Sequence, residues 1–424
     1  MPRRFDIDQL GPTRFDSPLE ALRIAWTHDD ERVRLDVEIE PGHPAGPAVL
    51  VERAGPRERL FFDPSRTTAA FVTCGGLSPG LNNVIRSGFH ELTHNYGVAR
   101  VLGIRNGYLG LDPASGLDPI ELDSAFVHDI HQLGGSVLGS SRGAQEPAAV
   151  VDCLIERGID ILFCIGGDGT QRGAHAIAEE IRRRDLAKSV IGVPKTIDND
   201  VPYVWTSFGY ATALEVASEV VRGAHVEATG VRSGVGLVKV MGRDAGFIAT
   251  GAALASQDAN FVLVPEVPFP LDGFLDALEA RLRARDHAVV VVAEGAGQHL
   301  LEGADRQRDA SGNLLYADIG IFLRDRIREH FAGTDLSLNL RYIDPSYAIR
   351  SVPANAWDRI LCDRMGRAAV HAAMAGKTDM LIGFWSGTLT HIPIATVTAS
   401  KKALALDGDA WNAVLSTTGQ PHWA

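Results

Sequence analysis

The feature that most constrains the fold is a repeated order of apolar run, sharp turn and helix that begins near residue 68. The runs 68–73 and 158–165 have the length of strands, and each ends in a glycine turn. A helical pattern follows both turns, with Val84, Ile85 and Phe89 after the first and residues 172–181 after the second. This alternation predicts an α/β protein with mostly parallel strands, in which ligands lie at the carboxyl ends of the strands.

The turn Gly166–Thr170 combines glycines with one acid. Gly166, Gly167 and Gly169 permit a close approach of a phosphate to the backbone, and the amides at the start of the following helix point at the anion. Asp168 would repel a bare phosphate, so its expected use is to hold Mg2+, directly or through water. The alternative is a tight turn that binds nothing.

The other glycine turn, Gly75–Gly80, supplies a second helix start that can face an anion. Its spacing is not that of a P-loop, and neither turn matches the dinucleotide fingerprint with its trailing acid. The sequence therefore favours neither a P-loop enzyme nor a dinucleotide dehydrogenase.

A third apolar run, 189–193, ends at Pro194 and is followed by a loop that carries two acids. If the loop is extended, Thr196, Asp198 and Asp200 point to the same side. Two close carboxylates raise one another's proton affinity, so one can accept a proton from a substrate hydroxyl while the other supports a metal or a positive group. This division of labour suits a kinase. The alternative is a turn in which the carboxylates cap loop amides.

Together these motifs resemble the phosphofructokinase family in their order and spacing. The matching segments cover roughly residues 68 to 400, and they are Gly75–Asn82, Gly107–Leu111, Gly134–Gly143, Gly166–Thr170, Pro194–Asp200, Met241–Arg243 and Pro265–Val267.

The resemblance implies two Rossmann-like lobes with mostly parallel sheets flanked by helices, and an active site in the cleft between them. We expect an N-terminal extension over 1–68, a donor-binding lobe over 69–210 to which the chain returns at about 350–400, a sugar-phosphate lobe over 211–349, and a C-terminal segment over 401–424. In the extension, Val33, Leu35, Val37 and Ile39 alternate with polar residues and predict a half-buried strand.

The activity that the resemblance implies is transfer of a phosphoryl group to the 1-hydroxyl of fructose 6-phosphate, giving fructose 1,6-bisphosphate, a step of glycolysis. Asp198 matches the general base, Asp200 assists it, and Arg243 suits stabilisation of charge on the group in transfer. Lys195 adds a point charge for a donor phosphate. The positions expected to receive the donor are Gly76, Tyr108, Arg142, Gly167, Asp168, Gly169 and Thr170, with Asp168 linked to Mg2+. The positions expected to hold the sugar phosphate are Thr196, Met241, Gly242, Arg243, Glu266, Arg341, Tyr347 and Arg350.

Some positions depart from the pattern of many bacterial members. Tyr347 stands where these have histidine, and an arginine expected seven residues before Met241 is replaced by Gly234. The sugar-phosphate site is therefore expected to differ in detail. Because one phosphate clamp of bacterial members comes from a neighbouring subunit, the resemblance predicts a homo-oligomer, a dimer or tetramer, in which Arg341 can act across an interface.

The family uses either ATP or pyrophosphate as donor. Pyrophosphate users resemble one another in an aspartate at the position of Gly169, which crowds out a nucleotide, and in a lysine at the position of Lys195. This chain has the glycine and the lysine, a combination found in plant and trypanosome-type ATP enzymes, so ATP is favoured and pyrophosphate is the alternative. Two further alternatives are a kinase for another sugar phosphate, such as sedoheptulose 7-phosphate, and a non-catalytic relative that binds sugar phosphates or nucleotides.

Composition agrees with a globular enzyme, since 45% of the 424 residues are hydrophobic. The formal net charge of -12 argues against a nucleic-acid partner. The beginning of the sequence shows no apolar signal core and no run could cross a bilayer, so we expect a cytoplasmic protein without a membrane partner. Lys401 and Lys402 are most simply a solvated pair, and the alternative is that these late basic residues touch a donor phosphate. The cysteines show no metal-ligand spacing and are expected to be reduced and buried; they are Cys74, Cys153, Cys164 and Cys362.

Overall fold

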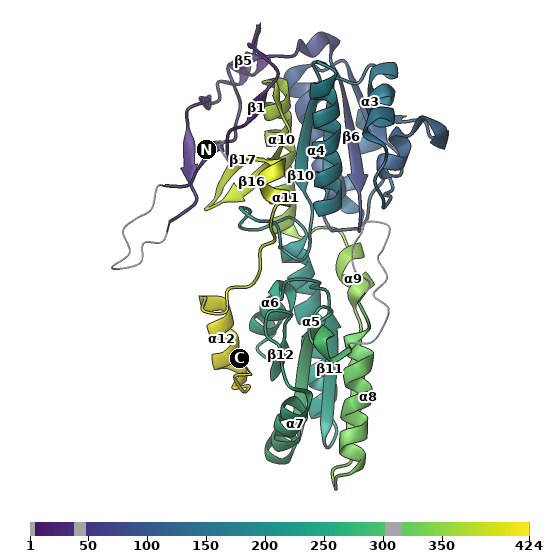
Figure 1. Ribbon diagram of the computed structural model, residues 1–424, viewed down its shortest axis with the longest axis vertical. Coiled ribbons are helices and arrows are strands. Elements are labelled where there is room, and N and C mark those ends of the chain that lie inside the picture. The colour runs from purple at the N-terminus through teal and green to yellow at the C-terminus, as the bar shows by residue number, and fades with distance from the viewer. Residues whose placement is uncertain (1–4, 38–47, 302–315, 424) are drawn as a thin grey trace. The chain divides into compact units, whose positions relative to one another are not determined.

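The computed structural model describes residues 5–37, 48–301 and 316–423 (Figure 1). The chain divides into two compact units, each built around its own sheet. The first unit consists of Met1–Thr196, Val201–Gly209 and Val352–Lys401, and the second of Ile197–Asp200, Tyr210–Ser351 and Lys402–Ala424. The loop with the two acids and the last residues of the chain thus belong to the second unit.

A nine-stranded sheet forms the centre of the first unit, in the order β3-β4-β17-β16-β10-β9-β6-β7-β8. Its central strands, from β16 to β7, are parallel, and antiparallel strands complete both edges. The bounds are β3 (Arg32–Arg34), β4 (Leu50–Arg53), β6 (Thr68–Cys74), β7 (Arg100–Ile104), β8 (Ile120–Glu121), β9 (Ile161–Gly166), β10 (Ser189–Pro194), β16 (Met380–Trp385) and β17 (Thr388–Pro393). The three strands predicted from the apolar runs, β6, β9 and β10, are confirmed.

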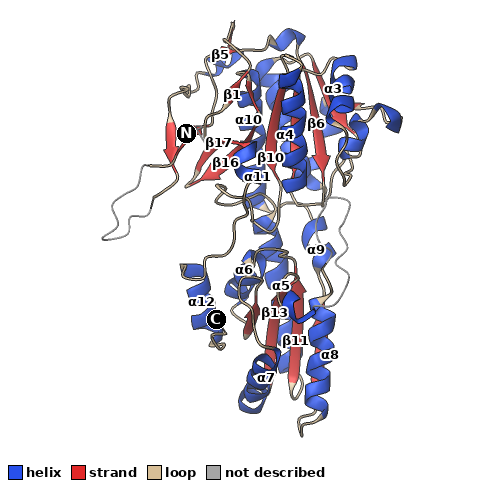
Figure 2. Ribbon diagram, viewed as in Figure 1, coloured by secondary structure: helices blue, strands red, loops and turns tan. Residues whose placement is uncertain are grey.

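Helices cover both faces of this sheet (Figure 2), which explains why its central strands are continuous apolar runs. Along β6, Ala69 and Phe71 pack into the core on one face, whereas Ala70 and Val72 pack into the core on the other. The first core contains residues of α1 (Leu81–His90) and α10 (Ala356–Met374), and the second contains residues of α3 (Pro147–Glu156) and α4 (Asp168–Arg183). Two shorter helices are α2 (Ser124–Val127) and α11 (Ile394–Thr398).

The N-terminal residues that the structure describes are part of the first unit, because they pair with its strands. β3 and β4 extend the large sheet beyond β17, β1 (Asp8–Gln9) pairs with β15 (Lys377–Thr378), and β2 (Phe15–Asp16) pairs with β5 (Arg59–Leu60). The strand predicted over 33–39 is shorter than expected, since β3 ends at Arg34, and Ile39 lies outside the described residues.

A buried ionic cluster joins this N-terminal segment to the rest of the unit. The carboxylate of Glu52 on β4 accepts hydrogen bonds from Arg57 at 3.0 Å and His391 at 2.9 Å, and it forms an ion pair with Lys377 at 3.2 Å. Burial alone would raise the pKa of Glu52, but the hydrogen bond from His391 and the charges of Lys377 and Arg57 hold it at about 2.

The second unit has a four-stranded parallel sheet in the order β12-β13-β11-β14. Helices α5 and α6 pack on one face together with α12, and α7 and α8 pack on the other. The strands are β11 (Gly234–Val240), β12 (Phe261–Leu263), β13 (His287–Ala293) and β14 (Asn339–Ile343). The helices are α5 (Tyr210–Thr229), α6 (Phe247–Ser256), α7 (Leu271–Arg285), α8 (Ile319–Ala332), α9 (Ser346–Ser351) and α12 (Asp409–Thr418).

Single turns of 3-10 helix connect many of these elements, and one π-helical segment, Glu91–Tyr96, continues α1. The 3-10 turns are Pro18–Leu22, Pro64–Arg66, Gly107–Leu111, Pro113–Ser115, Ile130–Gln132 and Gln298–Leu301. All four cysteines are free and buried, in line with the prediction. Among the described residues, no helix is both long and apolar enough to pass through a membrane.

Candidate active site

The acidic glycine turn of the first unit lies between the end of β9 and the start of α4. Gly166 has no room for a side chain, because a Cβ there would lie 2.1 Å from Thr170 Oγ1. Its carbonyl accepts hydrogen bonds from the side-chain amide of Gln171 at 2.9 Å and the backbone amide of Lys195 at 3.0 Å. These bonds hold the turn in place at a helix N-terminus, which is a favourable location for an anion.

Asp168 is the first residue of α4, and its side chain is about one-third exposed at 30%. Lys401 Nζ lies 3.9 Å from Asp168 Oδ2. Proteins commonly hold Mg2+ through one or two carboxylates together with the phosphates of a substrate. A single accessible carboxylate beside an anion-facing helix start therefore fits the predicted metal position.

Lys195 connects the two glycine turns of the first unit. It is buried, and its ammonium group donates to the carbonyl of Gly76. The second turn is also tied to the segment that carries the exposed Arg142, because Gly75 N donates to Ser141 O at 3.0 Å and Ser140 Oγ donates to Gly75 O at 2.6 Å. The structure thus brings Gly76 and Lys195 together and places Arg142 on the adjoining segment.

Tyr108 is buried, with 4% of its surface exposed. Its hydroxyl donates to the carbonyl of Thr170 at 2.7 Å, and its ring packs so closely on α4 that a Cβ at Gly173 would lie 2.7 Å from it. In this position Tyr108 supports the acidic turn through Thr170. Gly167 and Gly169 flank Asp168 in that turn, and Gly169 is exposed.

The two acids of the second unit lie in a loop that is not uniformly extended, because Asn199 between them has a φ of 56°. The predicted alternation still holds for burial, since Ile197 and Asn199 are buried and both aspartates are half-buried. Burial and then the charge of Asp200 raise the pKa of Asp198 well above its ordinary value, although the backbone amide of Arg243 donates to Asp198 and opposes the shift. A carboxylate with raised proton affinity is suited to act as a general base.

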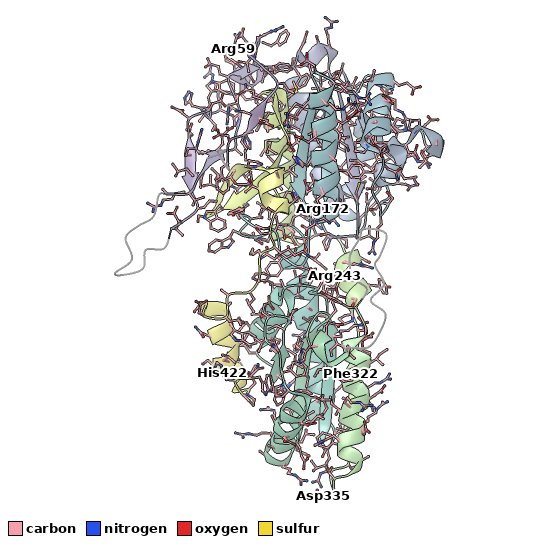
Figure 3. The ribbon with its side chains drawn as sticks, viewed as in Figure 1. Arg59, Arg172, Arg243, Phe322, Asp335 and His422 are labelled. Atoms are coloured by element: carbon pink, nitrogen blue, oxygen red, sulfur yellow. The ribbon has the colours of Figure 1, made fainter. Side chains whose placement is uncertain are left out.

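Arg243 follows β11 in the second unit (Figure 3). Its guanidinium lies 4.8 Å from the centre of the Tyr316 ring, and the Tyr316 hydroxyl donates to Asp244 Oδ1 at 2.8 Å. Met241 and Gly242 precede Arg243, and Gly242 needs the absence of a side chain because its φ is 125°.

Glu294 is a member of this group that the sequence analysis missed. It directly follows β13, and burial raises its pKa while the charge of Arg243 opposes the shift. Glu294 also contributes to the raised pKa of Asp198. The signal in the sequence is an acid that follows an apolar run at the carboxyl end of a parallel strand, the same signal that identified Asp198.

The remaining predicted sugar-phosphate residues are more dispersed. Arg341 is an exposed residue of β14. Arg350 on α9 stacks at 4.8 Å on the ring of Tyr347, which is 75% exposed, and its charge acts on Glu294. Thr196 belongs to the first unit, where its carbonyl accepts from Ser207 Oγ at 2.6 Å.

The structure gives a steric reason for Gly234, which replaces an expected arginine. A Cβ at this first residue of β11 would lie 2.0 Å from the carbonyl oxygen of Ala228. No side chain fits at that position without movement of the backbone.

Glu266 differs from a free sugar ligand because backbone amides occupy its carboxylate. Gly246 N donates to both oxygens, at 3.0 and 3.1 Å, and Leu404 N donates to Oε1 at 2.9 Å. Glu266 therefore fixes the start of α6 to the segment that precedes α12.

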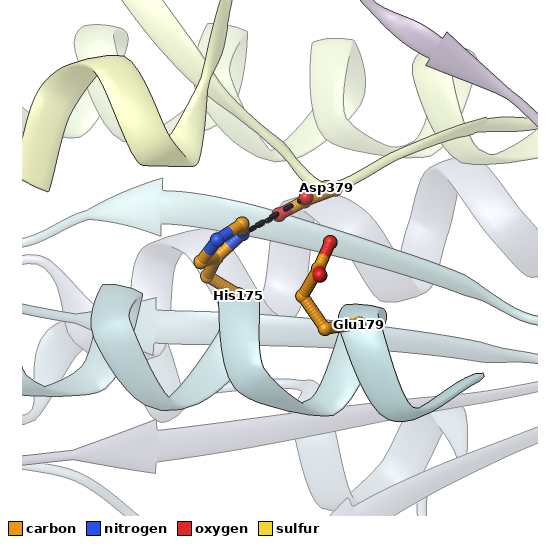
Figure 4. A group of neighbouring side chains, drawn as sticks. All are labelled: His175, Glu179 and Asp379. Carbon is orange, nitrogen blue, oxygen red and sulfur yellow. Dashed lines mark hydrogen bonds and ion pairs between the residues drawn. The ribbon is translucent and has the colours of Figure 1, made fainter. Parts of the chain in front are cut away.

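One further group in the described residues has the composition of a metal site: His175, Glu179 and Asp379 (Figure 4). His175 Nδ1 lies 2.9 Å from both carboxylate oxygens of Asp379. Arg182 forms ion pairs with Glu179 and Asp379, and it also pairs with Asp8 of β1. The guanidinium of Arg182 thus supplies positive charge to this cluster. Through Asp8, the cluster links the N-terminal segment to α4.

The glycine turns and the paired acids define an α/β protein built to handle phosphate groups. The family model for phosphofructokinase matches residues 68–373. The chain belongs to the phosphofructokinase family.

Several similar proteins carry a more specific name. The ATP-dependent 6-phosphofructokinase of Borreliella burgdorferi is 46% identical over 98% of this chain and 97% of its own length. The protein of that name from Amycolatopsis methanolica is 47% identical, covering 97% and 94%. ATP-dependent 6-phosphofructokinase 1 of Arabidopsis thaliana is 43% identical, covering 97% and 88%.

Solved structures show the same fold at lower sequence identity. A pyrophosphate-dependent phosphofructokinase from Marinobacter aquaeolei matches with a TM-score of 0.69 and 22% identity over 84% of this chain and 92% of that chain. Pichia pastoris phosphofructokinase matches with a TM-score of 0.65 and 23% identity over 84% of this chain and 37% of that chain.

Proposed function

We propose that this protein is an ATP-dependent 6-phosphofructokinase, which transfers a phosphoryl group from ATP to the 1-hydroxyl of fructose 6-phosphate. The observation that carries the proposal is the Asp198–Asp200 pair, in which burial and a neighbouring negative charge raise the pKa of Asp198. Relatives that are similar over nearly the whole chain are named for this activity.

In the proposed mechanism, Asp198 accepts the proton of the sugar hydroxyl as that oxygen attacks the γ-phosphorus of ATP, whose bond to the bridging oxygen breaks so that ADP leaves. Asp200 keeps the proton affinity of Asp198 high through its charge, and Arg243 stabilises the charge that develops on the transferred group. Glu294 shares the environment of Asp198 and Arg243, so we add it to the residues proposed to contact the sugar. Arg341 and Arg350 are the proposed partners of the 6-phosphate.

The donor phosphates are proposed to bind at the first unit, at the helix starts that follow the two glycine turns. Lys195 adds positive charge next to Gly76. Asp168 is the proposed Mg2+ ligand, and the metal would neutralise phosphate charge when bound. ATP is favoured over pyrophosphate because Gly169, exposed in the first turn of α4, leaves room for the rest of a nucleotide.

Two expectations about the assembly and the location of the protein are also part of the proposal. We propose a homo-oligomer, a dimer or tetramer, and the exposure of Arg341 on β14 supports a role for this arginine across a subunit interface. We propose the cytoplasm as the location, as expected for glycolysis. Sedimentation of the purified protein tests the first of these, since a monomer at micromolar concentration would contradict it.

The activity is tested by measuring fructose 1,6-bisphosphate formed from fructose 6-phosphate and Mg2+, with ATP and pyrophosphate supplied separately at matched concentrations. We expect product with ATP only. Product with pyrophosphate only would overturn the donor assignment, and product with neither donor would overturn the proposed function.

A further inference from the structure

The segment that follows the last residue of the first unit is anchored at two points in the second unit. Lys402 N donates to the carbonyl of Asp200 at 3.0 Å, and Leu404 N donates to Glu266 Oε1 at 2.9 Å. Leu404 is itself buried in the core beside α5, α6 and α12. The position of Lys402 relative to the loop with the two acids is therefore fixed by the backbone on one side and by Glu266 on the other.

The side chain of Lys402 is not the solvated cation that the sequence predicts. It is half-buried, and its ammonium group lies 5.0 Å from the centre of the Phe247 ring at the start of α6. Burial lowers the pKa of Lys402 to about 8, and the charge of Asp200 opposes this shift. A half-buried ammonium group keeps its charge when a nearby negative group compensates for the water that the ammonium group has lost.

The charges around the two acids show what this ammonium group can do. Asp200, Glu294 and Asp244 all raise the proton affinity of Asp198. Arg243, which follows β11, acts on Glu294 through its charge and on Asp198 through its backbone amide. Lys402 lies far from Arg243 in the sequence, and it adds a positive charge that interacts with Asp200.

We propose that Lys402 is a positioning residue for the Asp198–Asp200 pair, held in place by Glu266 through the segment 402–404. The role rests on the proposed kinase function. Lys402 offsets the repulsion between the two carboxylates. The loop can therefore hold both side chains close together, and Asp198 remains ionised when the sugar binds. Glu266 acts on the reaction through this segment.

The test compares Lys402→Met and Lys402→Arg with the wild type. In Lys402→Met we expect kcat to fall by about 10- to 100-fold, the size of one interaction with a charged group, while both KM values change little. The acidic limb of the profile of kcat against pH should move to higher pH by about 1 unit, because a positive charge near the carboxylates has been removed. Lys402→Arg keeps the charge and should restore the profile.

The matched control is Arg232→Met, which removes one positive charge from the same unit at a side chain that is 93% exposed. It should leave kcat and the pH profile unchanged. Glu266→Gln keeps the size of the side chain but weakens its bonds to Gly246 and Leu404, so it should shift the acidic limb in the same direction by a smaller amount. An unshifted profile in Lys402→Met, or a fall in the melting temperature without a change in the profile, would overturn the proposal.

Failure of the proposed function is a separate outcome. It is recognised when the wild type forms no product with either ATP or pyrophosphate. The role of Lys402 is then tested without turnover, by 13C NMR titration of labelled aspartate carboxyls assigned with Asp198→Asn and Asp200→Asn. A rise of about 1 unit in the apparent pKa of Asp198 in Lys402→Met supports the proposal, and an unchanged titration of Asp198 rejects it.

Discussion

Replacement of Asp198 by asparagine is the most direct perturbation of the proposed chemistry. The asparagine oxygen can still accept the hydrogen bond from the Arg243 amide, and its NH2 group can donate to Asp200, so the loop should keep its geometry. Only the ability to accept a proton is lost. General base catalysis contributes about 100- to 10,000-fold in rate, which corresponds to about 2.7–5.4 kcal/mol of transition-state stabilisation at about 1.36 kcal/mol for each factor of ten.

The same substitution should stabilise the folded protein near neutral pH. The pKa of Asp198 is raised in the folded state, so its stabilising contribution is fully present below the pKa of the unfolded chain and is lost as the pH rises through the folded pKa. Ionised Asp198 therefore costs stability at pH 7, and asparagine removes that cost. We expect a higher melting temperature at pH 7, with the difference from wild type shrinking toward acidic pH.

The assay measures kcat and KM for fructose 6-phosphate together with thermal melting. Asp276→Asn, an exposed position in α7 of the same unit, is the matched control and should change neither. A kcat for Asp198→Asn within tenfold of wild type would refute the assignment of the base. A lower melting temperature at pH 7 would refute the argument from burial and charge.

Three further predictions concern the donor turn and the stability of each unit. Gly169→Asp adds a carboxylate in the exposed first turn of α4, so the rate with ATP should fall by at least about tenfold; an unchanged rate with ATP would contradict the steric argument. Glu52→Gln breaks a buried ionic cluster and should cost about 3–5 kcal/mol in urea unfolding; because the pKa of Glu52 is lowered to about 2, the wild type should lose this advantage as the pH falls from about 4.5 toward 2. Gly234→Ala places a Cβ 2.0 Å from the Ala228 carbonyl and should cost about 1–3 kcal/mol in the same assay; unchanged stability would show that the start of β11 can move.

Much of the site was predictable because its signals are local. The apolar runs that became β6, β9 and β10 and the turns after them depend on periodicity and on glycine torsions within a few residues. The effect of the Asp200 charge on Asp198 was also predictable, since the two residues lie in one loop. Tyr108 and Glu266 were predicted as site residues from their positions in motifs. The contact of Tyr108 with Thr170 and the bonds of Glu266 to two backbone amides depend on distant segments.

The sequence by itself determined the α/β class, the family and the residue types at the turns, because strand periodicity, glycine placement and motif spacing are properties of short segments. Tertiary structure decided which charges are buried together. It placed Glu294 near Asp198, brought Lys402 against Asp200, and packed the N-terminal strands on β17 and β15. These outcomes follow from contacts between residues that are far apart in the chain, and the pKa of a carboxylate or lysine depends on such neighbours and on burial.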